Sequence, residues 1–182
     1  MVRDRLEVRL AGSGGQGVVL AGVILAEAAA GSGLGVSQFQ AYGPASRGGA
    51  SWTDVIVARG PVRYPKPSAL DVLVALTQEA CDASLGQLRA GGLVLFDSGR
   101  VAPPQRGDIE PHALPFGLSA EQVGSRQAAN LVALGALVAL TSAVGEDALE
   151  KAALAHVPER SREVNLRALR AGRLLVEAAN GS

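Results

Sequence analysis

The sequence has a single cysteine, Cys81, among its 182 residues. One thiol cannot close an internal disulfide, and it cannot supply the set of cysteine ligands that an iron–sulfur cluster needs. We therefore expect no cluster on this chain. Cys81 falls in a segment expected to be helical, over 77–88, where a small buried apolar role is more common than a reactive thiol.

An excess of charge of either sign is also missing. Lys and Arg number 17, as do Asp and Glu, so the formal net charge is zero. This charge balance does not indicate nonspecific electrostatic binding to nucleic acid or to an anionic membrane. The longest hydrophobic run, near Leu131–Ala143, is too short to span a bilayer, and the charged start over 1–5 has no apolar signal region. We predict a soluble, cytoplasmic protein.

What is present is the hydrophobic patterning of an α/β protein. Apolar Leu6, Val8 and Leu10 alternate with charged residues, as in a strand with one polar face. Two short apolar segments, over 71–76 and 93–96, flank a helix-like segment, an order typical of parallel strands covered on both faces. Further strands are expected over 36–40, 51–58 and 109–114, and helices over 18–30, 125–143, 146–155 and 161–179. We predict one domain over 1–182, with a Rossmann-like α/β fold, a mostly parallel sheet flanked by helices, and a helical C-terminal part.

A glycine-rich segment joins the first expected strand to the first expected helix. Gly12, Gly14 and Gly17 give the spacing G-x-G-x-x-G, in the strand–turn–helix context that makes this motif informative. Glycines allow positive φ and close approach of the backbone to a ligand. The free amides at a helix start favour a phosphate or another anion. Anion binding is our preferred interpretation, and a tight turn that needs small residues only for packing is the alternative.

Two common nucleotide sites are tested by the residues that follow this turn. A Walker A loop needs Lys and then Ser or Thr after its last glycine, whereas Val18 and Val19 follow here. A nicotinamide dinucleotide site needs an acidic residue at the end of the second strand, and no Asp or Glu occurs between Glu27 and Asp54. The triphosphate interpretation therefore fails, and the dinucleotide interpretation loses its second feature.

A second glycine-rich segment, over 42–49, follows the second expected strand. At this topological position a loop is expected near the glycine turn, at the carboxyl ends of the strands. It contains Arg47 followed by Gly48 and Gly49, and the planar fork of a guanidinium suits a phosphate or a carboxylate. On charge alone, a solvated arginine in a turn is an equally good interpretation of Arg47.

The two segments together resemble one protein family. They are similar to the gamma subunit (gamma domain) of the 2-oxoacid:ferredoxin oxidoreductases, which act on pyruvate, 2-oxoglutarate, 2-oxoisovalerate or indolepyruvate. The segments that carry the resemblance are Gly12-Ser13-Gly14-Gly15-Gln16-Gly17-Val18 and Tyr42-Gly43-Pro44-x-x-Arg47-Gly48-Gly49. Further matches are the strand over 69–76, Gly91-Gly92, Asn130, Leu134-Gly135, and the pattern from Glu163 through Asn165 and Ala168 to Gly172. The resemblance covers almost the whole chain.

The resemblance implies a Rossmann-like gamma domain that binds coenzyme A and contributes to subunit assembly. The whole enzyme oxidatively decarboxylates a 2-oxoacid to an acyl-CoA and reduces ferredoxin. Thiamine diphosphate, magnesium and 4Fe-4S clusters are then expected on partner alpha, beta and ferredoxin-like delta subunits, and none of them on this chain. Coenzyme A binding is assigned to Gly12, Ser13, Gly14, Gly15, Gln16, Gly17, Tyr42, Arg47, Gly48 and Gly49. We assign no catalytic residue and no metal ligand, since neither His112 nor His156 lies in a catalytic constellation.

Individual roles follow from this assignment. The turn amides receive a coenzyme A phosphate, Arg47 pairs with a phosphate, and Gln16 orients a ligand or a partner's backbone. Tyr42 packs on an adenine, on a partner or in the core, and Asn130 and Asn165 are expected to cap helices or tie them together. Two other functions stay open, a stand-alone Rossmann nucleotide-binding module and a pure interaction subunit. Homodimerisation of the isolated chain stays open too, because an apolar-rich subunit taken from a complex can self-associate.

Overall fold

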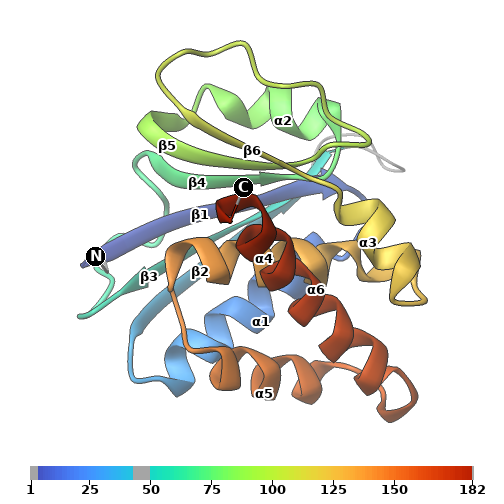
Figure 1. The fold of residues 1–182 in the computed structure, drawn as a ribbon. Coiled ribbons are helices and arrows are strands. Elements are labelled where there is room, and N and C mark those ends of the chain that lie inside the picture. The colour runs from blue at the N-terminus through green and yellow to red at the C-terminus, as the bar shows by residue number, and fades with distance from the viewer. Residues whose placement is uncertain (1–3, 43–49, 182) are drawn as a thin grey trace.

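The computed structural model describes residues 4–42 and 50–181, which form a six-stranded sheet with helices on both faces (Figure 1). The strand order is β2-β3-β1-β4-β5-β6. The strands are β1 (Arg5–Ser13), β2 (Gly35–Tyr42), β3 (Ala50–Ala58), β4 (Leu70–Ala75), β5 (Leu88–Asp97) and β6 (Glu110–Leu114). The helices are α1 (Val18–Gly31), α2 (Gln78–Leu85), α3 (Phe116–Gln122), α4 (Ala129–Thr141), α5 (Glu146–His156) and α6 (Arg162–Asn180), with short 3-10 turns at Arg126–Ala128 and Glu159–Ser161. The predicted α/β class and the helical C-terminal part are confirmed.

The sheet is mostly parallel, as predicted. β1, β4, β5 and β6 are parallel neighbours, whereas β3 lies antiparallel between β1 and β2. Because β3 opposes both of its neighbours, β2 points in the same direction as β1. A dinucleotide-binding Rossmann sheet has its second parallel strand directly beside the first. Here an antiparallel strand separates the two, so the end of β2 lies one strand farther from the glycine turn.

The pairing register places the glycine turn, the end of β2 and the start of β3 at one edge of the sheet. Ser13, the last residue of β1, pairs with Ala50, the first residue of β3. Tyr42, the last residue of β2, pairs with Ser51. Segment 43–49 lies outside the described residues, but the chain leaves and re-enters the sheet beside the glycine turn. The end of β2 and the start of β3, which this segment joins, therefore lie near the glycine turn, as the sequence predicts.

Helices cover the two faces of the sheet unequally. α1 and α4 pack on one face, α5 and α6 form an outer layer beyond them, and α2 lies on the opposite face (Figure 1). The alternation in β1 explains the larger core, in which Val8 and Leu10 are buried with Leu25 of α1. A smaller core under α2 contains Leu73 and Phe96. Within 4–42 and 50–181, no helix has the length and apolarity to cross a membrane.

α4 and α6 approach each other through two glycines. A Cβ added at Gly135 of α4 would meet the backbone of Leu169, and one at Gly172 of α6 would meet the backbone of Val132. Only glycine lets the two helix backbones lie this close. The helical C-terminal part is thereby fixed to α4, whose first turn carries Asn130.

Three helical segments differ from the expectation. The helix expected over 77–88 ends at Leu85, because Leu88 already begins β5. The helix expected over 125–143 begins as a 3-10 turn and becomes α4 only at Ala129. α3 was not expected at all, because its seven residues are too few to show a helical period.

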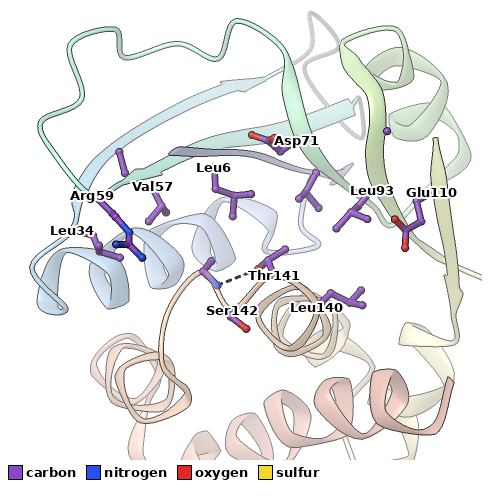
Figure 2. A pocket seen from close by; sticks show the side chains of 14 residues that line it. Leu6, Leu34, Val57, Arg59, Asp71, Leu93, Glu110, Leu140, Thr141 and Ser142 are labelled. Carbon is purple, nitrogen blue, oxygen red and sulfur yellow. Dashed lines mark hydrogen bonds between the residues drawn. The ribbon is translucent and has the colours of Figure 1, made fainter. Parts of the chain in front are cut away.

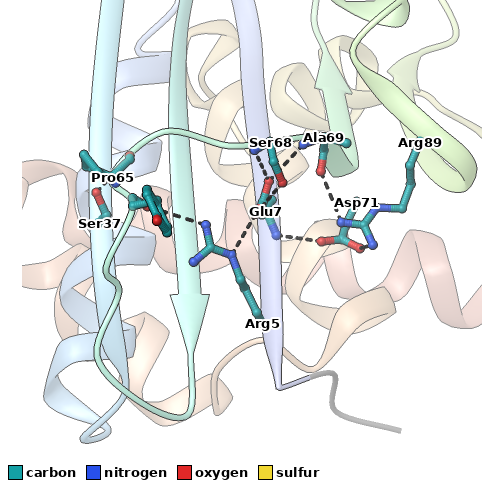
Figure 3. A network of polar contacts seen from close by, with 9 residues as sticks. Arg5, Glu7, Ser37, Pro65, Ser68, Ala69, Asp71 and Arg89 are labelled. Carbon is teal, nitrogen blue, oxygen red and sulfur yellow. Dashed lines mark hydrogen bonds and ion pairs between the residues drawn. The ribbon is translucent and has the colours of Figure 1, made fainter.

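A polar network anchors the segment between β3 and β4 to the start of β1 (Figure 3). The buried carboxylate of Glu7 accepts hydrogen bonds from Arg5 Nε and from the amide of Ser68, both at 2.7 Å. The amide of Glu7 donates to Asp71 at 2.8 Å, and Asp71 also lies 3.1 Å from Arg89. The network joins the amino ends of β1, β4 and β5, at the opposite end of the sheet from the glycine turn.

Candidate functional site

The glycine turn has a defined backbone geometry. The amide of Gln16 donates to the carbonyl oxygen of Ser13 at 3.2 Å, and Gly15 has a φ of 90°. A positive φ at the third position is what a type II turn requires. Gly17, which precedes α1, has a φ of 70°. The G-x-G-x-x-G segment thus has glycine at the two positions where another residue would be strained.

The side chain of Gln16 folds back on the turn. Its Oε1 accepts a hydrogen bond from the amide of Ser13 at 2.7 Å. The same oxygen occupies the space that a Cβ at Gly12 would need. One turn amide is therefore already satisfied within the protein, and an anion must use others.

The side chain of Asn130 holds the turn from the other side. Its Nδ2 donates to the carbonyl oxygen of Gly17 at 2.9 Å, and its Oδ1 accepts from the amide of Leu131 at 3.0 Å. Asn130 is buried, and its Nδ2 would collide with a Cβ on Gly17. The structural role expected of Asn130 is confirmed, since it ties the start of α4 to the start of α1. Asn165 makes no side-chain hydrogen bond with the described part of the chain.

The amides at the start of α1 are the donors that remain. Gly17 provides no side-chain cap, and the first turn has no acidic residue. The first intrahelical bond runs from Ala21 to the carbonyl of Gly17, so the amides of Val18, Val19 and Leu20 have no partner inside the helix. Together with the dipole of a 14-residue helix, these amides favour an anion bound at the amino end of α1.

A crevice of about 180 Å³ opens beside the turn, at the carboxyl ends of β4 and β5. Gly15 and Gln16 form one wall, and α3 and the 3-10 turn before α4 form the other. Its other lining residues include Leu76, Asp97, Arg100, Glu121 and Arg126. This is the position at which open α/β sheets bind their ligands.

Two arginines line the crevice, each beside a carboxylate. Arg100 lies 3.8 Å from the buried carboxylate of Asp97, too far for a hydrogen bond, and its side chain is 57% exposed. Asp97 itself accepts from the amides of Gly99 and Gly117, both at 3.2 Å, so its role is to fix the loop after β5. Arg126 pairs with Glu121 at 2.7 Å and is 78% exposed. Arg100 is therefore the more available cation.

The predicted site residues divide into three groups. Gly12, Ser13, Gly15, Gln16 and Gly17 lie together in the turn, with Gly14 exposed at its tip. Tyr42 ends β2 beside them, although only its backbone is described. The remaining residues, Arg47, Gly48 and Gly49, lie outside the described residues.

Sequence reasoning missed the two crevice arginines. The signal for Arg100 is its place just after β5, since residues that follow parallel strands gather at one edge of a sheet. Arg126 has no comparable signal, because it reaches the site through the packing of α3 and α4. Arg100, which follows β5, thus places a cation beside the turn although it is not part of the glycine motif.

The chemically reactive side chains lie elsewhere. His112 Nε2 is 3.2 Å from Glu110, and His156 Nε2 is 2.8 Å from Glu27. His112 lies on β6, the short strand expected over 109–114. Burial, aided by the charge of Asp82, raises the pKa of the Cys81 thiol to about 11. Among the described residues, no three His, Cys, Asp or Glu side chains group in a way that would hold a metal ion.

Comparison with known proteins gives a consistent set of relatives. The family model described as pyruvate ferredoxin/flavodoxin oxidoreductase matches residues 7–175. The 2-oxoglutarate synthase subunit KorC of Methanocaldococcus jannaschii is 41% identical over 175 residues, which are 94% of each chain. The crystal structure of a keto/oxoacid ferredoxin oxidoreductase gamma subunit from Geobacter sulfurreducens has a TM-score of 0.89 and 45% identity, over 97% of this chain and 99% of that chain.

A larger solved enzyme contains the same fold. The 2-oxoglutarate:ferredoxin oxidoreductase of Magnetococcus marinus, with 2-oxoglutarate, coenzyme A and succinyl-CoA bound, has a TM-score of 0.88 and 26% identity. The match covers 97% of this chain but 32% of that one. The fold described here therefore corresponds to about one third of that longer polypeptide.

Proposed function

Because this chain belongs to the pyruvate ferredoxin/flavodoxin oxidoreductase family, we propose that it is the gamma subunit of a multisubunit 2-oxoacid:ferredoxin oxidoreductase. In this role it binds coenzyme A and holds the catalytic subunits together. The relatives are subunits of oxidoreductases that use ferredoxin as electron acceptor. The solved relative with coenzyme A bound supports the coenzyme A part of the proposal.

One observation carries the assignment of coenzyme A to this chain. Gly15 and Gln16, which lead into the uncapped start of α1, line the same crevice as the exposed guanidinium of Arg100, at the carboxyl edge of the sheet. Coenzyme A carries a diphosphate and a ribose phosphate, so it presents anions to two places at once. Amides at a helix start and an arginine are two donor types that suit phosphates.

The size of the crevice supports a shared site. At about 180 Å³ it is smaller than the roughly 300–1,000 Å³ of pockets that enclose a whole ligand. It fits a phosphate-bearing part of coenzyme A, with the remainder lying over the turn and against a partner subunit. Arg47, Gly48 and Gly49 belong to the segment that joins β2 to β3 next to the turn, and we propose that they complete the site.

The redox and decarboxylation chemistry is proposed to lie on other chains. The only cysteine, Cys81, is a buried residue of α2 with a raised pKa, and one such thiol does not fit the ligand set of an iron–sulfur cluster. Thiamine diphosphate supplies the chemistry that cleaves the 2-oxoacid, and clusters carry the electrons to ferredoxin. We assign both, with magnesium, to alpha, beta and delta partners. This chain positions coenzyme A to accept the acyl group.

Kinetics of the assembled enzyme test the proposal. Arg100→Gln in the complete complex should raise the KM for coenzyme A about ten- to a hundredfold, as expected for one charge-assisted hydrogen bond. The KM for 2-oxoglutarate, the substrate named for the Methanocaldococcus relative, should stay the same. Arg160→Gln, at an exposed arginine on the 3-10 turn before α6, is the matched control.

Two outcomes would favour the other functions. If Arg47→Ala weakens assembly and leaves the apparent affinity for coenzyme A intact, the chain is a pure interaction subunit. If calorimetry on the full chain shows tight NADH binding and no response to coenzyme A, it is a stand-alone nucleotide-binding module. Purification from native cells without any thiamine- or cluster-bearing partner would contradict the subunit assignment itself.

A further inference from the structure

A second cavity lies at the opposite end of the sheet from the glycine turn (Figure 2). Its volume is about 310 Å³, within the range of pockets that enclose small ligands. Its walls expose polar and apolar surface in about equal measure and come from the amino ends of the parallel strands, the end of β3 and the last turn of α4. The main apolar contributors are Leu6, Leu34, Val57, Val72, Leu93 and Leu140. β1 spans nine residues between the two ends, so roughly 25 Å separate this cavity from the coenzyme A site.

Arg59 places a cation at the mouth of this cavity. Its side chain lies beside Leu34, on the side of the sheet where α4 ends (Figure 2). It also lines a wider hollow of about 770 Å³ that continues toward the start of α5. The nearest carboxylate, that of Asp4, is 3.9 Å away and 95% exposed. Within 4–42 and 50–181 the guanidinium makes no hydrogen bond, so its donors remain for a ligand.

The other charges around the cavity do not compete for this position. The carboxylate of Asp71 is already engaged by the amide of Glu7 and by Arg89. Glu110, at the far wall, lies on β6, four strands along the sheet from β3, which Arg59 follows. A ligand with one anionic group is therefore matched by Arg59, whereas a second anionic group would meet Glu110.

The α4 end of the wall has an unusual backbone. Ser142 has a φ of 51°, the only positive value for a non-glycine residue among the described residues. It lines both hollows. Glycine is the residue that most often ends a helix in this conformation. A serine adds a hydroxyl to the wall at some conformational cost, which fits a polar role at the mouth.

We propose that this cavity binds a small monocarboxylate with an apolar chain. The carboxylate pairs with Arg59 at the mouth, and the chain lies under β1 and β4 between Leu6, Val72 and Leu140. The cavity shares no lining residue with the crevice beside the turn, so a ligand here does not occupy the proposed coenzyme A site. A ligand here would act on the subunit from a separate site.

Methyl NMR on the full-length chain tests this proposal with three probes. Hexanoate should shift the methyl signals of Leu34, Leu93 and Leu140. Hexanol, which lacks the charge, and adipate, which adds a second carboxylate, should each bind at least about ten times more weakly, since one charge-assisted contact is worth about a tenfold change or more. The signals of Val18 and Val19 beside the glycine turn should not move.

Two variants distinguish binding in this cavity from nonspecific binding to apolar surface. Arg59→Gln should weaken hexanoate about tenfold or more and leave hexanol unchanged. Arg63→Gln, at an exposed arginine without a side-chain contact in the described chain, should change neither. The proposal is overturned if hexanoate causes no shift at about 10 mM, which would saturate a site with a Kd of about 1 mM. It is also overturned if Arg59→Gln binds hexanoate as the wild type does.

Discussion

Asn130 at the start of α4 donates a hydrogen bond across 2.9 Å to the carbonyl oxygen of Gly17, which lies 113 positions earlier in the chain. This contact connects the glycine turn to the helical C-terminal part. α4 is in turn fixed to α6 by Gly135 and Gly172. The turn is therefore held by a packed helix pair as well as by the hydrogen bonds between Ser13 and Gln16.

Replacing Asn130 should loosen this connection. Asn130→Ala removes the donor to Gly17 and the acceptor for the amide of Leu131, so the free energy of unfolding should fall by about 1–3 kcal/mol. Asn165→Ala, which removes the same side chain where no hydrogen bond is described, should change stability by less than about 0.5 kcal/mol. Urea denaturation measures both. Equal stability of the two variants would show that the contact does not hold the turn.

The conformation of Gly17 supports a second prediction. Gly17→Ala puts a Cβ on a left-handed residue and against Asn130 Nδ2. It should lower the free energy of unfolding by about 1–2 kcal/mol or more. Gly86→Ala is the matched control, because Gly86 has a φ of −65° and open space around it. Stability there should be unchanged or raised by up to about 1 kcal/mol. A Gly17→Ala protein as stable as Gly86→Ala would contradict the strain argument.

Much of this fold is readable from the sequence because its signals are local. The alternation at Leu6, Val8 and Leu10 identifies β1, and the apolar segments of β4 and β5 identify the parallel strands beside it. The glycines over 12–17 identify the turn between the first strand and the first helix, because a positive φ, as at Gly15 and Gly17, favours glycine. The antiparallel direction of β3 has no such local signal. It depends on strand pairing between residues far apart, which periodicity does not report.

The crevice illustrates the same limit at the site. Arg100 and Arg126 come from the segments after β5 and before α4, and neither belongs to a motif. They meet the turn only because β5 lies two strands from β1 and α3 packs beside it. Gln16 shows the reverse case. It belongs to the motif, but its side chain bonds the amide of Ser13, a contact that the motif alone does not predict.

The Glu7 network makes stability depend on pH. Burial raises the pKa of Glu7, but hydrogen bonds from Arg5, Ser68 and Ala69 and the charge of Arg5 outweigh it, so the pKa lies below its ordinary 4.5. A carboxyl with a lowered folded-state pKa stabilises the protein above the unfolded pKa. That stability is lost as the pH falls through the folded value.

Glu7→Gln tests this dependence. The variant should be less stable than the wild type by about 1.5–3 kcal/mol near neutral pH, the value of a hydrogen bond to a charged group. The difference should shrink as the pH falls below about 4.5. Urea midpoints measured from about pH 7 down to about pH 3 give the curve. Glu163→Gln, at an exposed glutamate, should follow the wild type, and a constant gap between Glu7→Gln and the wild type would rule out the proposed linkage.

A buried ion pair under the α2 side of the sheet supports the last prediction. Arg9 of β1 contacts Asp54 of β3 through two hydrogen bonds, Nε to Oδ1 at 2.6 Å and Nη2 to Oδ2 at 2.8 Å. Both side chains are almost fully buried, and the Arg9 guanidinium lies 5.4 Å from the ring centre of Trp52. The pair joins β1 to the antiparallel strand that distinguishes this sheet.

Removing one partner leaves a buried charge without its counter-charge, so Asp54→Ala should cost about 3–5 kcal/mol. Replacing both partners, as in Arg9→Met with Asp54→Leu, removes the charge together with its desolvation cost. The double variant should therefore recover most of that loss. Thermal and urea denaturation of Arg9→Met, Asp54→Leu and the double variant form a double-mutant cycle, and Asp54→Ala is measured beside them. A double variant no more stable than Asp54→Ala would mean that the pair is needed to set the register of β3, and that its geometry rather than its charge balance stabilises the sheet.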